Sequence, residues 1–262
     1  MDSGELLKVA ETVVAEAERM FIGGLGADPF ELKAEGDFAT EVDLKIETHL
    51  RRRLTELTAI PVFGEEAGGQ KRQPMVWVVD PIDGTANYAA GNPMCSILVS
   101  LLVDGQPVVA VTAIPLLGRR LSAHEGSPLF LNGQPATPLR DRDKRVAQIG
   151  FSSVGSPLNS QFPSLVRQGL LSRLAETYLR PRITGSVGVD LAFTAQGIFG
   201  GAVSFSPHVW DNAAGVMLVR AAGGVVTDTE GRPWTPESAG VVAGNAQAHA
   251  DILSTMDEIL NQ

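Results

Sequence analysis

The sequence has very little cysteine, few aromatic residues and no long apolar run among its 262 residues. Its single cysteine, Cys95, excludes an internal disulfide framework and a thiolate zinc site. Cys95 lies in an apolar run and is expected in the core. No stretch approaches the about 18 apolar residues that a membrane helix needs, and no signal peptide is evident. We therefore expect a cytoplasmic protein with no membrane partner.

Basic residues are also scarce, with 21 Lys and Arg against 30 Asp and Glu, which gives a net charge of -9. Nucleic-acid binders usually present a basic face, so we expect no nucleic-acid partner. The acidic excess fits either a solvated surface or carboxylates that bind cations. The sequence lacks a P-loop string and a complete dinucleotide-binding fingerprint.

The apolar content of 44% is enough for a large core and a mixture of helices and strands. We predict an α+β fold with an N-terminal half at residues 1–140 and a C-terminal half at 141–262, together forming one compact unit. Periodicity predicts helices at 4–22 (capped by Ser3), 40–57, 160–176, 189–196, 211–222 and 247–260. It predicts strands at 75–79, 121–124, 146–151 and 201–205, and a hairpin of 96–103 with 107–114. Arg51, Arg52 and Arg53 are expected to form a solvated, dipole-matched helix end.

The most informative stretch is Trp77-Val78-Val79-Asp80-Pro81-Ile82-Asp83-Gly84-Thr85. A buried strand ends here at two carboxylates, and backbone N–H groups follow that could face an anion. This arrangement is typical of a site that holds divalent cations against a phosphate.

Each of three other acidic segments has an ordinary structural explanation when it is considered alone. Thr40 and Asp43 match a helix-capping box, and Asp211 matches a helix N-cap. Glu65 follows a short apolar strand, as Asp80 does, so both can project from one sheet edge. Four carboxylates without a His or Cys cluster favour a hard cation such as Mg²⁺.

Together these segments resemble the inositol monophosphatase family of magnesium-dependent, lithium-sensitive phosphatases, over nearly the whole chain and most like its actinobacterial members. The matching segments are Asp37-x-x-Thr40-x-x-Asp43, Gly64-Glu65-Glu66, Asp80 to Tyr88, Asn132-Gly133, Gly185-Ser186-x-Gly188 and Trp210-Asp211-x-Ala213-Ala214-Gly215. The resemblance implies an alternating α-β-α-β-α layered sandwich of the inositol monophosphatase and fructose bisphosphatase type, usually a homodimer.

The resemblance also implies roles for the matching residues. Two or three Mg²⁺ ions would be bound, Li⁺ would inhibit, and the substrate would be a small phosphorylated polyol or sugar. Catalysis is expected from Glu65, Thr85 and Asp43. The metal ligands are expected to be Glu65, Asp80, the Ile82 carbonyl, Asp83 and Asp211. The substrate is expected to contact Asp83, Gly84, Thr85, Arg182, Ser186, Val187 and Asp211.

The sequence departs from the family pattern in the substrate pocket. Ser204 stands where animal members carry an inositol-contacting glutamate. Arg182 is either a substrate contact or a surface arginine, and His208 is expected to be a packed or surface residue. Lys33 lies one position away from a lysine of the family.

Other substrates and another class of function stay open. Fructose-1,6-bisphosphate, histidinol phosphate or an adenosine bisphosphate could replace inositol monophosphate with the same chemistry. A non-catalytic regulatory binding protein is the alternative of another class, and it need not have retained every metal ligand.

Overall fold

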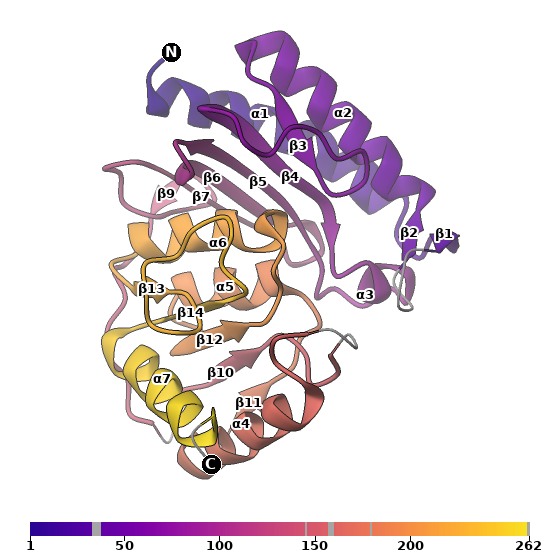
Figure 1. Ribbon diagram of the computed structural model, residues 1–262. Helices are drawn as coiled ribbons and strands as arrows, with labels where there is room; N and C mark the ends of the chain where they lie inside the picture. Colours follow the sequence, from indigo (N-terminus) through magenta and orange to yellow (C-terminus); the bar gives the residue numbers. More distant parts are fainter. Residues whose placement is uncertain (33–37, 145, 157–159, 179, 261–262) are drawn as a thin grey trace.

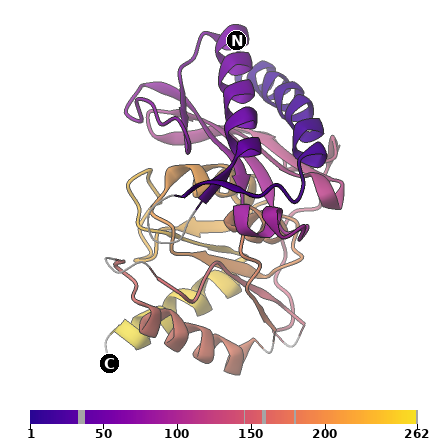
Figure 2. The same cartoon turned by 90° about the vertical axis from the view of Figure 1, so that its right-hand side faces the viewer.

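The computed structural model of the protein describes residues 1–32, 38–144, 146–156, 160–178 and 180–260. Within these residues, helix layers and sheet layers alternate from α1 and α2 at one end to α4 and α7 at the other (Figure 1). Figure 2 shows the same stack from the side, with the two termini at opposite ends. The predicted α-β-α-β-α sandwich is confirmed.

The larger sheet has seven strands in simple sequence order, and only its first pair, β3 with β4, is parallel. Its strands are β3 (Val62–Gly64), β4 (Met75–Asp83), β5 (Ser96–Val103), β6 (Gln106–Ile114), β7 (Arg119–His124), β8 (Phe130–Leu131) and β9 (Gln134–Pro135). The 3₁₀ turn η2 (Pro115–Leu117) joins β6 to β7. Asp104 and Gly105 both adopt positive φ in the β5–β6 turn, as a tight hairpin requires.

The smaller sheet has five strands in the order β11-β10-β12-β14-β13. They are β10 (Ile149–Phe151), β11 (Pro181–Arg182), β12 (Gly201–Ser204), β13 (Val225–Thr227) and β14 (Val241–Gly244), and a separate pair joins β1 (Pro29–Leu32) to β2 (Phe38–Thr40). The helices are α1 (Ser3–Gly23), α2 (Glu41–Thr58), α3 (Thr85–Ala89), α4 (Ser164–Thr177), α5 (Val187–Ala195), α6 (Val209–Ala221) and α7 (Ala246–Leu260). The predicted division at residue 140 falls between β9 and β10, outside both sheets, and stays a prediction.

Alternation along the strands builds separate cores on the two faces of each sheet. In β4, Trp77 and Val79 pack with α1 and α2, whereas Val76 and Val78 pack with α5 and α6. Successive side chains of a strand point to opposite faces, so one strand supplies two cores. The outer face of the smaller sheet packs in the same way against α4 and α7. The helices α5 and α6 are therefore covered on both sides, which explains why almost every residue in them is buried.

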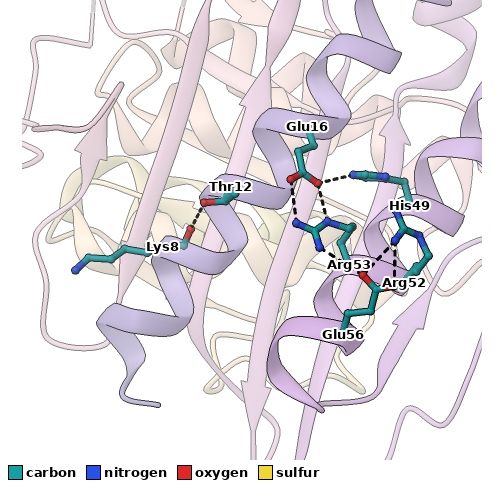
Figure 3. A network of polar contacts seen from close by, with 7 residues as sticks. All are labelled: Lys8, Thr12, Glu16, His49, Arg52, Arg53 and Glu56. Atoms are coloured by element: carbon teal, nitrogen blue, oxygen red, sulfur yellow. Dashed lines mark hydrogen bonds and ion pairs between the residues drawn. The ribbon is translucent and has the colours of Figure 1, made fainter.

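Polar contacts also fix α1 against α2 (Figure 3). Glu16 of α1 accepts from the Arg53 guanidinium at 2.9 and 3.1 Å and lies 2.9 Å from the His49 ring. The hydrogen bond from Arg53 lowers the pKa of Glu16 despite its partial burial. Arg52 pairs with Glu56 instead.

Several predicted boundaries were wrong, each for a local reason. The cap of α1 is Asp2, which forms a capping box with Glu5, and not Ser3. The helix predicted at 160–176 begins at Ser164, because Pro163 occupies the N-cap position. The expected solvated, dipole-matched helix end is present only in part: Arg52 is exposed, whereas Arg51 and Arg53 bind Glu47 and Glu16, and none of the three lies in the last turn of α2.

Candidate active site

Parallel pairing of β3 and β4 brings two acidic residues together at one edge of the sheet. Gly64, the last residue of β3, is aligned with Val79, so Glu65 leaves β3 beside Asp80, which is still within β4 and paired with Leu98 of β5. The Glu65 N–H donates to the Val79 carbonyl at 3.3 Å. The shared edge expected from the sequence is present.

Asp80 is the most deeply buried acid of this edge, with 1% of its surface exposed. Burial raises its pKa well above the usual value, and the nearby charges of Glu65, Asp83 and Asp211 raise it further. Its Oδ1 atom is buried and has no hydrogen-bond partner among the described residues. Three acids from separate segments of the chain therefore act on one carboxylate.

These groups fit a hard divalent cation. A buried carboxylate oxygen without a partner is costly unless a cation compensates it, and the available donors are all oxygen atoms. In the described part of the chain, no three His, Cys, Asp or Glu side chains already face one point as ligands would. Asp80 and Glu65 instead share a side-chain hydrogen bond, so ion binding would require these side chains to turn.

Asp83, the second carboxylate of the motif, is the last residue of β4 and is buried, with 7% of its surface exposed. Its carboxylate accepts from the Ser96 hydroxyl at 2.9 Å, the Gly188 N–H at 2.8 Å, the Val187 N–H at 3.2 Å and the Ser186 hydroxyl. Burial raises the pKa of Asp83, and these hydrogen bonds oppose the rise. Asp83 thus ties β4 to the start of α5.

The predicted pair of Thr85 and Asp43 is present. The Thr85 hydroxyl lies 3.3 Å from Asp43 Oδ1 and 3.0 Å from the Ile82 carbonyl oxygen. Asp43 Oδ2 accepts from the backbone N–H and the hydroxyl of Thr40, at 2.8 and 2.6 Å. Asp43 therefore completes the capping box of α2 and also contacts Thr85, so its two readings are compatible.

The turn after Asp83 requires glycine. Gly84 has a φ of +85°, in the left-handed region that favours this residue. A Cβ atom there would lie 3.1 Å from both the Met94 carbonyl oxygen and Ser186 Cβ. Gly84 and Thr85 are half-buried, in contrast to the buried Asp83, so their backbone is accessible to a small anion.

Asp211 is the third residue of α6, whose N-cap residue is His208. The N-cap reading of Asp211 was therefore wrong, and its charge instead reaches Asp80. The His208 ring stacks on Trp210 at 4.6 Å, and Trp210 contacts Phe63 at 5.5 Å. The ring contact therefore joins Phe63, which precedes Gly64-Glu65, to Trp210, which precedes Asp211.

The remaining predicted substrate contacts have different surroundings. Arg182 is exposed in the edge strand β11, and its guanidinium donates to the Pro181 carbonyl at 3.0 Å. Ser186 and Val187 are buried and hold Asp83, as described above. Lys33 and Asp37 lie outside the described residues.

Sequence reasoning missed the role of Asn87. Its side-chain amide donates to the Met94 carbonyl at 2.6 Å and to the Thr184 carbonyl at 2.8 Å. Asn87 thereby holds the segment before Ser186 against the turn that contains Gly84 and Thr85. The residue stood within a quoted motif, but nothing in the sequence showed which distant carbonyl it would bind.

Comparison with known proteins decides the family. The model of the inositol monophosphatase family matches residues 2–261. The chain belongs to the inositol monophosphatase family. It is 47% identical to the inositol-1-monophosphatase ImpA of Mycolicibacterium smegmatis, over 95% of this chain and 90% of that protein. It is 46% identical to the probable inositol 1-monophosphatase ImpA of Mycobacterium tuberculosis, over 97% and 94%.

Solved structures agree with the fold. The extragenic suppressor protein SuhB of Bartonella henselae superposes with a TM-score of 0.88 at 24% identity, covering 97% of this chain and 99% of that one. The predicted resemblance to actinobacterial inositol monophosphatases is confirmed by the two mycobacterial relatives. Members of this family depend on metal ions, in agreement with the oxygen donors at the β3–β4 edge.

Proposed function

We propose that this protein hydrolyses inositol monophosphate to inositol and phosphate, with Mg²⁺ as its cofactor. The observation that carries the proposal is that Glu65, which follows β3, lies beside Asp80 of the parallel strand β4, and that the charge of Asp211 also acts on Asp80. The 47% identity to a mycobacterial inositol-1-monophosphatase supports the choice of substrate.

Glu65, Asp80, the Ile82 carbonyl, Asp83 and Asp211 would hold two or three Mg²⁺ ions. When bound, such ions lower the pKa of a coordinated water and neutralise charge on the phosphate and the leaving oxygen. The buried, unpaired Oδ1 of Asp80 is the donor atom that most needs a cation.

The protein's own groups orient the reaction. The Gly84 and Thr85 N–H groups would bind phosphate oxygens. The Thr85 hydroxyl would donate a hydrogen bond to Asp43, which leaves its oxygen to accept a hydrogen bond from the attacking water. Glu65, which follows the neighbouring strand β3, would hold the same water. Attack in line with the leaving alkoxide then needs no covalent phosphoenzyme.

The substrate pocket differs from that of animal members. Ser204 is 2% exposed, and its hydroxyl accepts from the Ser206 N–H at 3.2 Å, so it offers no carboxylate to an inositol hydroxyl. Arg182 is exposed on the edge strand and is the candidate for a compensating contact, together with Asp83, Ser186, Val187 and Asp211.

The test is phosphate release by the purified protein. We expect Mg²⁺-dependent release from inositol monophosphate, faster than from fructose-1,6-bisphosphate, histidinol phosphate or an adenosine bisphosphate. We also expect inhibition by Li⁺, which would occupy one cation position. Release from none of these esters would contradict the proposal and favour a regulatory binding protein.

Two further expectations accompany the proposed function. A homodimer would give twice the 27.7 kDa chain mass in light scattering. A cytoplasmic location would place the protein in the soluble fraction of its own cell. In the described residues, no helix is both long and apolar enough to cross a bilayer.

A further inference from the structure

The loop that carries Glu65 is held by a second carboxylate. Glu47 lies one turn after Asp43 on α2, and its side chain is 2% exposed. It accepts from the Glu66 N–H at 2.6 Å and from the Ala67 N–H at 2.9 Å. These are the two residues directly after Glu65, so Glu47 determines where the turn beyond the strand lies.

A guanidinium completes this arrangement. Arg51 lies one turn further along α2 and donates to Glu47 Oε1 at 2.9 Å. It also donates to the Val62 carbonyl at 2.6 Å and to the Gly68 carbonyl at 2.8 Å. Val62 precedes the Glu65 turn and Gly68 follows it, so the two side chains hold the turn at both ends and in its middle.

The Glu47 side chain and the backbone of β3 are closely packed. A Cβ atom on Gly64 would lie 2.4 Å from the Glu47 carboxyl carbon. The backbone of β3 therefore runs directly against the Glu47 carboxylate. The same face of α2 presents Asp43 to Thr85, two turns before Arg51. One helix thus fixes the relative positions of the Thr85–Asp43 pair and the Glu65 turn.

We propose that Glu47 and Arg51, which we call the loop clamp, are positioning residues that set Glu65 for cation binding. The inference deepens the proposed function and rests on it. Neighbours that orient a metal's ligands commonly change metal affinity or activity by 10- to 100-fold when they are replaced. Glu47 contacts the backbone beside the ligand, so it acts through Glu65 and touches no substrate.

The test compares Mg²⁺ binding in Glu47→Gln and in the wild-type protein by isothermal titration calorimetry. Glutamine keeps the shape but offers one acceptor oxygen to two N–H groups, so the Glu65 turn should loosen. We expect the Kd for Mg²⁺ to rise about 10-fold. The Mg²⁺ concentration for half-maximal phosphate release should rise in parallel.

Glu56→Gln is the matched control, because it removes an exposed carboxylate that pairs with Arg52 and Arg53 on α2, at 3.0 and 3.4 Å, and not the carboxylate that accepts from the Glu66 and Ala67 N–H groups. It should bind Mg²⁺ as the wild type does. Equal Mg²⁺ affinity in Glu47→Gln and Glu56→Gln would overturn the loop clamp, even if Glu47→Gln lowered the unfolding temperature.

Arg51→Lys carries the test if Glu47→Gln does not fold. Lysine keeps the charge but cannot reach two carbonyls and Glu47 together, so the Mg²⁺ Kd should again rise, and wild-type affinity would overturn the inference. If the wild-type protein binds Mg²⁺ yet releases no phosphate, the proposed function is wrong. The comparison of Mg²⁺ affinities by calorimetry still tests the loop clamp in that case.

Discussion

At the scale of single residues, the acids of the site also hold the fold together. Asp43 caps α2 and contacts Thr85, and Asp83 binds two hydroxyls and two backbone N–H groups of distant segments. Asp80 is the opposite case, because one of its buried oxygens has no partner. Replacement of these acids should therefore affect stability in different directions.

Asp83→Asn should abolish turnover and also destabilise the protein. The carboxylate accepts four hydrogen bonds, and an amide would present its NH₂ group to at least one of these donors. Loss of hydrogen bonds to a buried charged group should lower the free energy of unfolding by about 2 kcal/mol. Urea denaturation measures this change, and unaltered stability would show that the Asp83 contacts contribute little to the fold.

Asp80→Asn should make the metal-free protein more stable while it removes Mg²⁺ binding. Burial and three neighbouring acids raise the pKa of Asp80, so its ionised form is unfavourable without a cation. An uncharged amide avoids this cost, so we expect the free energy of unfolding of the metal-free protein to increase at neutral pH. Thermal unfolding in the presence of a chelator measures the gain; a clear loss would mean that Asp80 is not under electrostatic strain.

The raised pKa of Asp80 also predicts a pH dependence. The folded pKa lies above the unfolded one, so this group contributes stability below the unfolded value and loses it as pH rises through the folded value. Bound Mg²⁺ would displace the proton and remove the loss. The rise in unfolding temperature on adding Mg²⁺ should therefore become larger as the pH rises through the folded pKa of Asp80. Differential scanning calorimetry measures the unfolding temperature with and without Mg²⁺ at each pH, and a smaller rise at the higher pH would contradict the prediction.

At the scale of helices and strands, close packing of α5 and α6 sets the position of Asp211. Gly215 lies one turn after Asp211, and a Cβ atom on it would lie 2.4 Å from Leu191 Cδ1 and 2.5 Å from Leu191 Cβ. The two helices can approach this closely only because the residue has no side chain.

Gly215→Ala should cost about 2 kcal/mol of stability through overpacking, and it should reduce turnover because α6 must shift. Gly169→Ala in α4 is the control: its Cβ would meet nothing closer than Ile259 at 3.6 Å. Alanine favours a helix over glycine, so this control should be neutral or stabilising by about 0.5–1 kcal/mol. Equal effects of the two substitutions in thermal unfolding would contradict the packing argument.

Element types were predictable wherever a pattern is local. The apolar stripe of α1, the Thr40 capping box and the Asp104-Gly105 hairpin are all present. The errors came from contacts between segments far apart in the sequence. Nothing local shows that Arg53 binds Glu16 on another helix. The start of α6 was predicted two residues late, because Val209 and Trp210 did not stand out from the preceding loop.

The same limit applies to the site. Motifs named the residues, and apolar strands before Glu65 and Asp80 predicted their common edge. The sequence could not show that Asp83 is buried by Ser96 and Ser186, because those contacts depend on the packing of both sheets. Glu47 follows Asp43 at a spacing of four, which was the available signal for the loop clamp.

At the scale of the whole molecule, the site joins the two sheet systems. Glu65 and Asp80 come from the larger sheet, whereas Asp211 comes from α6 in the middle helix layer (Figure 1). Asp83 and Asn87 already connect these parts through hydrogen bonds to the segment at 184–188. A cation bound by the three acids would stabilise the packing of the larger sheet against the middle helix layer.

The most direct measurement is phosphate release from inositol monophosphate while Mg²⁺ is titrated into chelator-treated protein. The convergence of carboxylates onto bound cations predicts no release without metal and a saturable rise as Mg²⁺ is added. Release at the full rate without any divalent cation would contradict the central claim, as would failure of Mg²⁺ to bind at all.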